Sequence, residues 1–325
     1  MTQASHFLEV KNMKQYFPIR KGVFKRTVGY VRAVDDVSFF IDDQETLGLV
    51  GESGCGKTTL GRTVLHLLKP TEGKAFFMGQ DVETMLSDNP RGIRQKMQII
   101  FQDPYGSLNP RMTVNEIVGE AVRYYGLCSK RELDDYISEV LSKCGMLPEH
   151  RFRYPHEFSG GQRQRISIAR ALALKPKFVV CDEPVSALDV SIRSQILNLL
   201  NELKEQLKLT YLFISHDLAV VRHISDRVAV MYLGKIVEKA PKLEFFGNPL
   251  HPYSHALLSA IPVPDPKRQR QRIILEGDVP SPANPPSGCR FNPRCRYAME
   301  RCKKEEPQLV DVGNGHFVAC FLHSK

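Results

Sequence analysis

The stretch Thr46-Leu-Gly-Leu-Val-Gly-Glu-Ser-Gly-Cys-Gly-Lys-Thr58 decides the fold of this chain. It joins a short apolar run of the buried-strand type to a glycine-rich turn, and a helical pattern follows over residues 59–68. The turn fits the P-loop pattern, in which glycines let successive backbone N–H groups face a phosphate at the positive end of the next helix. We therefore predict that the turn binds the phosphates of a nucleotide, through Gly51, Glu52, Ser53, Gly54, Cys55, Gly56, Lys57, Thr58 and Thr59.

Cations and carboxylates follow in places that suit phosphate chemistry. Lys57 is expected to reach the β and γ phosphates, and the Thr58 hydroxyl is expected to ligate Mg²⁺. Phe178-Val-Val-Cys-Asp182-Glu183 is an apolar strand that ends in two carboxylates. One carboxylate can hold the Mg²⁺ shell and the other can polarise a water for attack on the γ phosphate. Because neighbours on a strand point in opposite directions, Asp182 and Glu183 are expected to do different jobs.

Short apolar runs alternate with helical patterns along the chain, which is typical of a parallel sheet in an α/β protein. Residues 211–214 form a further run of this kind, after those at residues 46–50 and 178–181. The first 45 residues alternate in a strand-like way, around a basic loop at residues 21–26. We therefore predict strands before the P-loop and a parallel sheet after it.

The strand signals stop between residues 103 and 158, where two helices are predicted. One is an amphipathic helix with apolar residues at helical spacing, namely Leu133, Ile137, Val140, Leu141 and Cys144. The other covers residues 113–125, with a capping box of Thr113 and Glu116. This segment is interpreted as a helical insertion, at about residues 103–170, within the α/β core.

Composition changes near residue 261, where several prolines precede a basic run. We predict a domain boundary there, which separates residues 1–260 from an extension of residues 261–325. The prolines nearest the boundary are Pro262, Pro264 and Pro266.

Composition excludes several other classes of protein. The chain has 325 residues, of which 42% are hydrophobic and 25% charged, as in soluble globular proteins. It contains no run of 18 apolar residues and no secretory signal, so any work at a membrane is expected from outside the bilayer. About half of the net charge of +9 lies in the C-terminal tail and the rest is scattered, without a basic and aromatic stripe, so no nucleic-acid partner is predicted.

Ser159-Gly-Gly-Gln162 opens a further helical pattern, directly after Phe158. A serine and two glycines at a helix start can bind an anion, although an ordinary N-cap explains them equally well in isolation. Between a P-loop and an apolar strand with Asp-Glu at its end, this sequence resembles the signature of ABC ATPases.

The remaining motifs of that family occur in order. Gln102 matches the Q-loop glutamine, and Asp189, in Ser186-Ala-Leu-Asp189, matches the D-loop aspartate. His216 matches the switch histidine. Phe17 lies where the family stacks an aromatic ring on adenine, with Tyr16 as the alternative.

The resemblance implies a fold and a division of labour. The fold is a P-loop NTPase core with an N-terminal antiparallel β subdomain, a helical signature subdomain and a small Cys-rich C-terminal extension. Two such domains pair head to tail, so that ATP on Lys57 of one faces a set of residues of the other, namely Ser159, Gly160, Gly161, Gln162 and Asp189. Within one chain the family pattern gives Mg²⁺ to Thr58, Gln102 and Asp182, the attacking water to Glu183, and the γ phosphate to Lys57 and His216.

Four of the eight cysteines crowd into the last 37 residues, namely Cys289, Cys295, Cys302 and Cys320. Four thiolates so close together suit zinc or an iron–sulfur cluster. Neighbouring arginines were expected to offset the charge of the sulfurs; they are Arg290, Arg294, Arg296 and Arg301. The segment at residues 284–295 resembles the C-terminal extension of oligopeptide and dipeptide importer ATPases, closest to the dipeptide type. That resemblance implies a [4Fe-4S] cluster on these cysteines, with Zn²⁺ as the alternative.

The resemblance also implies the partners. We expect an ATP-hydrolysing subunit that powers import of dipeptides or oligopeptides, peripheral on the cytoplasmic face of the cell membrane. It would work with a second, homologous ATPase subunit, two permease subunits and, indirectly, an extracytoplasmic solute-binding protein. The alternatives are an importer of another solute, such as an oligosaccharide or nickel, and a soluble ABC ATPase acting on nucleic acid.

Overall fold

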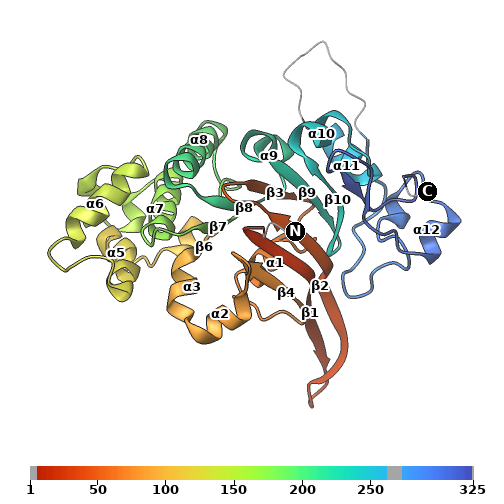
Figure 1. Ribbon diagram of the computed structural model, residues 1–325, viewed down its shortest axis with the longest axis horizontal. Helices are drawn as coiled ribbons and strands as arrows, with labels where there is room; N and C mark the ends of the chain where they lie inside the picture. Colours follow the sequence, from red (N-terminus) through yellow and green to blue (C-terminus); the bar gives the residue numbers. More distant parts are fainter. Residues whose placement is uncertain (1–5, 262–272, 324–325) are drawn as a thin grey trace, which may run out of the picture. The chain divides into compact units, whose positions relative to one another are not determined.

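The computed structural model describes residues 6–261 and 273–323 (Figure 1). By packing, the chain forms two compact units. The P-loop unit comprises Met1–Phe40, Leu47–Gly79 and Ser215–Lys325. The Glu183 unit comprises Ile41–Thr46 and Gln80–Ile214. Among the described residues, no helix has both the length and the apolar character that crossing a membrane requires.

The P-loop unit contains most of the strands. Strand β1 lies between β2 and β4, and it pairs with β4 in antiparallel register from Leu8 opposite Phe77 onward. A second series of neighbouring strands has the order β11-β12-β10-β9-β3, in which β3 and β9 are parallel and the other pairs are antiparallel. The elements of this unit are β1 (Leu8–Lys21), β2 (Arg26–Ile41), β3 (Thr46–Val50), α1 (Lys57–Val64), β4 (Glu72–Phe77), α9 (Leu218–Ile224), β9 (Arg227–Tyr232), β10 (Lys235–Pro241), α10 (Lys242–Gly247), α11 (Pro252–Ser259), the 3-10 helix η3 (Asn292–Arg294), α12 (Glu300–Lys304), β11 (Val310–Asp311) and β12 (Phe317–Val318).

Strand β3 leads into the P-loop, and every residue of it is buried, as its unbroken apolar pattern predicts. Helix α1 begins directly at Lys57 and ends at Val64. The prediction of a helix to residue 68 was wrong, because His66 adopts a left-handed backbone with φ of 53° and the chain turns there.

The Glu183 unit holds three parallel strands in the order β8-β7-β6, with Val180 of β7 opposite Ile99 of β6 and Leu212 of β8. Helices α5 and α6 confirm the two helices predicted in the insertion, and α5 has the predicted Thr113–Glu116 capping box. The elements of this unit are β5 (Gln80–Asp81), α2 (Val82–Asp88), α3 (Pro90–Lys96), β6 (Met97–Ile100), α4 (Pro104–Ser107), α5 (Val114–Tyr125), α6 (Leu133–Lys143), the 3-10 helices η1 (Pro148–Phe152) and η2 (Pro155–Glu157), α7 (Gly160–Leu172), β7 (Phe178–Asp182), α8 (Val190–Leu207) and β8 (Thr210–Ser215).

The C-terminal segment packs within the P-loop unit. Strand β12 extends the sheet at β10, with Val318 opposite Glu238. The prolines of the predicted domain boundary, Pro262, Pro264 and Pro266, lie outside the described residues, and the boundary at residue 261 stays a prediction.

Candidate nucleotide site

The P-loop backbone has a shape that only glycine permits at two places. Gly51 and Gly56 have φ of 153° and 107°. A Cβ on Gly51 would lie 2.2 Å from the carbonyl oxygen of Met231, and one on Gly56 would lie 2.0 Å from that of Ala33. Both positions therefore need glycine for backbone conformation and for close approach, as a phosphate cradle requires.

The Lys57 side chain lies across the turn in which it is predicted to bind phosphate. Its side chain is buried, and its Nζ donates to the carbonyl oxygens of Gly51 at 2.7 Å and Glu52 at 2.9 Å. These bonds hold the ammonium group beside the phosphate-binding turn and satisfy it there.

The backbone N–H, the carbonyl oxygen and the carboxylate of Glu52 are all hydrogen-bonded within the protein, and its place in the P-loop did not predict these contacts. Its backbone N–H donates to the Tyr253 hydroxyl at 2.8 Å, and its carbonyl accepts from Lys57. Its carboxylate accepts two hydrogen bonds from Arg294, at 2.7 and 3.1 Å. The hydrogen bonding with Glu52 raises the pKa of Arg294 above its already high value, so this guanidinium is always charged.

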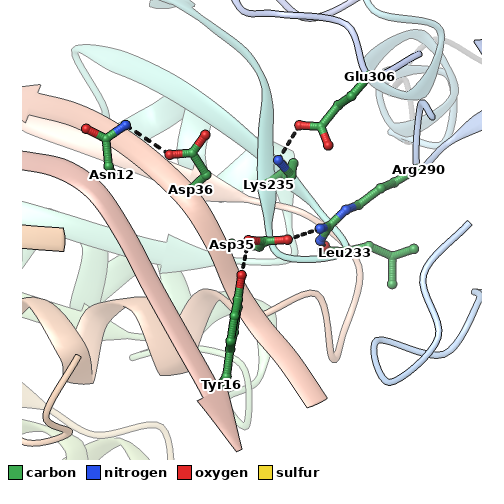
Figure 2. Close-up of polar contacts among 8 residues, drawn as sticks. All are labelled: Asn12, Tyr16, Asp35, Asp36, Leu233, Lys235, Arg290 and Glu306. Carbon is green, nitrogen blue, oxygen red and sulfur yellow. Dashed lines mark hydrogen bonds and ion pairs between the residues drawn. The ribbon is translucent and has the colours of Figure 1, made fainter. Parts of the chain in front are cut away.

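Arg290 makes a second contact of this kind, near Tyr16, the alternative residue for adenine stacking (Figure 2). It forms a buried ion pair with Asp35, and Asp35 also accepts a hydrogen bond from the Tyr16 hydroxyl. Although burial raises the pKa of Asp35, the Tyr16 hydroxyl and Arg290 hold it below its usual value. The hydroxyl of Tyr16 is thus engaged inside the protein, whereas the Phe17 ring is 38% exposed and suits base stacking better.

These contacts correct one prediction about the tail. Arg290 and Arg294 were expected to offset the charge of the four sulfurs, but they pair with Asp35 and Glu52 instead. The partners are 255 and 242 residues apart in sequence, so no local pattern could have revealed them. The sequence did not predict the contacts of Asp35, Tyr253, Arg290 and Arg294.

The Glu183 unit brings Gln102 and Glu183 together. The Gln102 Nε2 donates to Glu183 Oε2 at 3.1 Å, which links the Q-loop glutamine to the predicted base. Strand β7 ends at Asp182, and Glu183 itself has a left-handed φ of 46°, a strained conformation for a residue with a side chain. Its carbonyl accepts a 3.1 Å bond from the Ser186 hydroxyl. The sharp turn, and not strand alternation, therefore separates the directions of the two carboxylates.

Ser159 is the N-cap of α7. Its hydroxyl accepts from the Gln162 N–H at 3.3 Å, and its own N–H donates to Gln162 Oε1 at 3.0 Å. A Cβ on Gly161 would lie 2.4 Å from Ile192 Cγ2, so this glycine permits close packing against α8. Local structure thus accounts for these residues, and Ser159 is also exposed. Their role toward a facing subunit stays a prediction.

Asp189 and His216 lie at the surface. Asp189 is the N-cap residue of α8, and His216 follows β8. Their positions leave the predicted roles untested.

The four C-terminal cysteines line one cavity of about 10 Å³, the room that one water needs. Burial, together with the neighbouring thiols, raises the pKa of Cys289 to about 11. Among residues 6–261 and 273–323, no group of three His, Cys, Asp or Glu side chains is arranged to hold a metal ion. The predicted iron–sulfur cluster and its zinc alternative therefore stay predictions.

Two family patterns match parts of the chain, and known proteins match it over all or nearly all of its length. The sequence pattern of the family "ABC transporter" matches residues 34–186, and that of "Oligopeptide/dipeptide transporter, C-terminal region" matches residues 237–302. The chain is 54% identical to "Oligopeptide transport ATP-binding protein AppF" of Bacillus subtilis (strain 168), with 100% of both chains covered. It is 52% identical to "Probable peptide ABC transporter ATP-binding protein y4tS" of Sinorhizobium fredii (strain NBRC 101917 / NGR234), with 98% of this chain and 90% of the relative covered.

A solved structure agrees with the P-loop fold. It is described as the "Dimeric structure of a post-hydrolysis state of the ATP-binding cassette MJ0796 bound to ADP and Pi". The TM-score is 0.64 and the identity 27%, over 72% of this chain and 98% of that one. From these matches, this chain is an ABC ATPase and belongs to the oligopeptide/dipeptide transporter family of ATP-binding subunits.

Proposed function

We propose that the chain hydrolyses ATP to power a membrane importer of dipeptides or oligopeptides. The single observation that carries the proposal is full-length identity of 54% to a relative named as an oligopeptide transport ATP-binding protein. The match of residues 237–302 to the C-terminal region of this transporter family supports the peptide cargo over oligosaccharide or nickel. The location proposed is the cytoplasmic face of the cell membrane.

The nucleotide roles follow from the residues that could hold ATP and Mg²⁺. The glycine cradle and the buried Lys57 fit the phosphates, and Phe17 offers an exposed ring to adenine. Thr58, Gln102 and Asp182 would hold Mg²⁺, which neutralises phosphate charge when bound. The remaining proposed phosphate contacts are those of Gly51, Glu52, Ser53, Gly54, Cys55, Gly56 and Thr59.

Glu183 would accept a proton from the attacking water. Its carboxylate is buried and hydrogen-bonded by Gln102, which fixes where the oxygen points. His216 would contact the γ phosphate and orient the same water. The chemistry is then positioning and charge neutralisation, without a covalent intermediate.

A facing ATPase subunit would complete the site. The exposure of Ser159 and Asp189 supports this arrangement, because both remain available to a partner. We propose a homologous second ATPase as that partner, with Ser159, Gly160, Gly161, Gln162 and Asp189 facing its nucleotide.

The permease subunits would dock on the loop at residues 103–110. Tyr105 there is 63% exposed, and the Arg163 guanidinium covers its ring at 3.9 Å. This leaves an aromatic surface that a permease helix could contact.

The division into an ATPase domain of residues 1–260, with a helical signature insertion, and a Cys-rich extension of residues 261–325 is also proposed. Within the extension, a [4Fe-4S] cluster on Cys289, Cys295, Cys302 and Cys320 is supported by one fact, that all four line the same cavity. Absorbance near 400 nm in anaerobically purified protein, with iron and sulfide assays, tests it; zinc alone would refute it.

Reconstitution tests the proposed function. The chain would be placed in proteoliposomes with its partner ATPase, two permeases and the solute-binding protein, and uptake of labelled peptides measured with and without ATP. We expect ATP-dependent uptake of peptides, and none of oligosaccharides or nickel. Uptake of oligosaccharides or nickel in place of peptides would show that the proposed cargo is wrong. ATPase activity that responds only to nucleic acid would show that the chain is not an importer subunit and would favour an ABC ATPase that acts on nucleic acid.

A further inference from the structure

The C-terminal segment contacts a P-loop residue directly through a charged side chain. Arg294 lies in η3, and its side chain is 7% exposed where it meets the Glu52 carboxylate. Backbone N–H groups are what a P-loop uses to bind phosphate, so a carboxylate at Glu52 adds nothing to phosphate binding itself. Its two hydrogen bonds to Arg294 instead fix the turn to the tail.

Arg290 connects the tail to a second part of the site (Figure 2). Besides its ion pair with Asp35, it donates to the carbonyl oxygen of Leu233, in the turn between β9 and β10. The next residue of that turn, Gly234, donates to the Cys55 carbonyl at 2.9 Å and accepts from the Asp35 N–H at 2.8 Å. Arg290 therefore contacts the β9–β10 turn, which is hydrogen-bonded both to Cys55 of the P-loop and to Asp35 of strand β2.

A third ion pair, between Lys235 of β10 and Glu306 of the tail, lies beside this turn (Figure 2). Aromatic packing supports the same surface, because the rings of Tyr232, Tyr253 and Phe291 are in mutual contact, with centroids 4.8 to 5.4 Å apart. Tyr253 is also the residue whose hydroxyl accepts the Glu52 N–H. The tail is thus packed and charge-paired against the turn that binds phosphate.

We propose that the C-terminal extension sets the affinity for ATP. Arg294 positions the P-loop through Glu52, and Arg290 positions Tyr16, the chain neighbour of the proposed adenine-stacking residue Phe17, through Asp35. The inference rests on the proposed nucleotide site at the P-loop. A turn that is already held in its binding conformation loses less conformational freedom when phosphate binds, so the contact strengthens binding. Arg294 and Arg290 touch neither water nor phosphate in this scheme, and they act as positioning residues.

The first test replaces Arg294 with Gln and measures the Kd of a fluorescent ATP analogue, together with KM and kcat for ATP. We expect Kd and KM to rise roughly 10-fold, because a hydrogen-bonded charge pair is lost, while kcat at saturating ATP stays within about 2-fold. The matched control is Lys303→Gln, which removes an exposed ion pair with Glu300 on the same extension and should leave Kd unchanged.

Charge exchange separates positioning from simple destabilisation. Glu52→Arg combined with Arg294→Glu restores a pair of opposite charges, and we expect it to recover most of the affinity lost in Arg294→Gln. If Arg294→Gln fails to fold, Glu52→Gln removes the charge from the other side and should raise Kd in the same way. An unchanged Kd in the folded variant, or a fall in kcat with Kd unchanged, overturns the proposal.

A second ligand separates the proposed effect of Arg294 on phosphate binding from the proposed effect of Arg290 on adenine binding. Inorganic tripolyphosphate occupies the phosphate cradle without a base, and it is measured as a competitor of the fluorescent ATP analogue. Arg294→Gln should weaken both ligands, whereas Tyr16→Phe, which removes the hydroxyl bound to Asp35, should weaken only ATP, by roughly 2- to 3-fold. Equal effects of Tyr16→Phe on the affinities for both ligands would refute the proposed role of Arg290 and Tyr16 in adenine binding.

Lys57→Ala keeps this inference distinct from the proposed site. If Lys57→Ala leaves ATP binding intact, the proposed nucleotide site itself is wrong. If Lys57→Ala weakens binding and Arg294→Gln does not, only the positioning role of the extension is wrong.

Discussion

The phosphate-binding turn of the P-loop unit and the carboxylate of the Glu183 unit are held in different ways. Glu52 and Lys57 are fixed by hydrogen bonds to backbone oxygens, to the Tyr253 hydroxyl and to Arg294. Glu183 is buried, lies on a strained turn and accepts from the flexible side-chain amide of Gln102. The turn proposed to bind phosphate is held by residues distant in sequence, and the carboxylate proposed as the base is hydrogen-bonded by the proposed Q-loop glutamine.

This contrast indicates a division of labour. A braced turn binds phosphate in one conformation, which supports affinity. A carboxylate that depends on a loop amide changes its direction when the loop moves, which suits a step that must be switched on and off. Changes in the P-loop unit should then alter ATP affinity, and changes around Glu183 should alter turnover.

Glu183→Gln should give the largest effect. The amide keeps the size of the side chain but cannot accept the proton of the attacking water, so kcat should fall roughly 10²- to 10⁴-fold while ATP still binds. Steady-state ATPase activity and the Kd of ATP, measured on the same preparation, check both halves of the statement. Activity near wild type would show that another group is the base.

Lys57→Ala should act on affinity instead. Loss of the ammonium group that lies beside the turn removes a charge-assisted contact to phosphate, and the Kd of ATP should rise roughly 10- to 100-fold. Isothermal titration with ATP measures it. A large loss of kcat without loss of affinity would break the contrast between the two units.

The sequence predicted local features well. The burial of β3 and the Thr113–Glu116 capping box depend on residues within a few positions of one another. The predicted strand geometry at Asp182–Glu183 was wrong in detail, because β7 ends one residue earlier and Glu183 adopts a left-handed conformation that its residue type does not signal.

Contacts made by the tail could not be predicted in the same way. The arginines near the cysteines were visible, but their partners depend on the tail folding back onto a turn that lies 242 residues earlier. Charge at Arg294 indicated a need for an anion nearby, and the nearest sulfurs were the wrong choice. Only the three-dimensional packing brings Glu52 to it.

Acid should weaken the P-loop unit, where buried titratable groups are concentrated. Burial lowers the pKa of His251 from its ordinary 6.5 to about 4, with Glu238 opposing the shift and His323 and His255 adding to it. Because the unfolded chain binds this proton more readily, stability is full above pH 6.5 and is lost as the pH falls toward 4, by roughly 2 kcal/mol at pH 5. Urea unfolding at pH 7.5 and pH 5 measures the loss.

A matched pair of variants assigns that loss. His251 accepts from the Tyr253 N–H at 3.1 Å as the N-cap of α11, and Asn can take over this bond without titrating. His251→Asn should therefore flatten the pH dependence, while His156→Asn, at an exposed histidine of the Glu183 unit, should not. An unchanged slope in His251→Asn would contradict the assignment.

Gln102→Ala should have the smallest effect, and it tests the contrast most directly. Loss of the 3.1 Å bond to Glu183 frees the carboxylate, so kcat should fall roughly 10-fold with little change in the Kd of ATP. Gln102→Glu then separates the two roles proposed for this residue. A second carboxylate would strengthen a Mg²⁺ contact but would repel Glu183, so lower activity than in Gln102→Ala means that orienting Glu183 matters more. Activity restored toward wild type means that Mg²⁺ binding matters more, and the hydrolytic half would then be organised by the metal and not by the Q-loop amide.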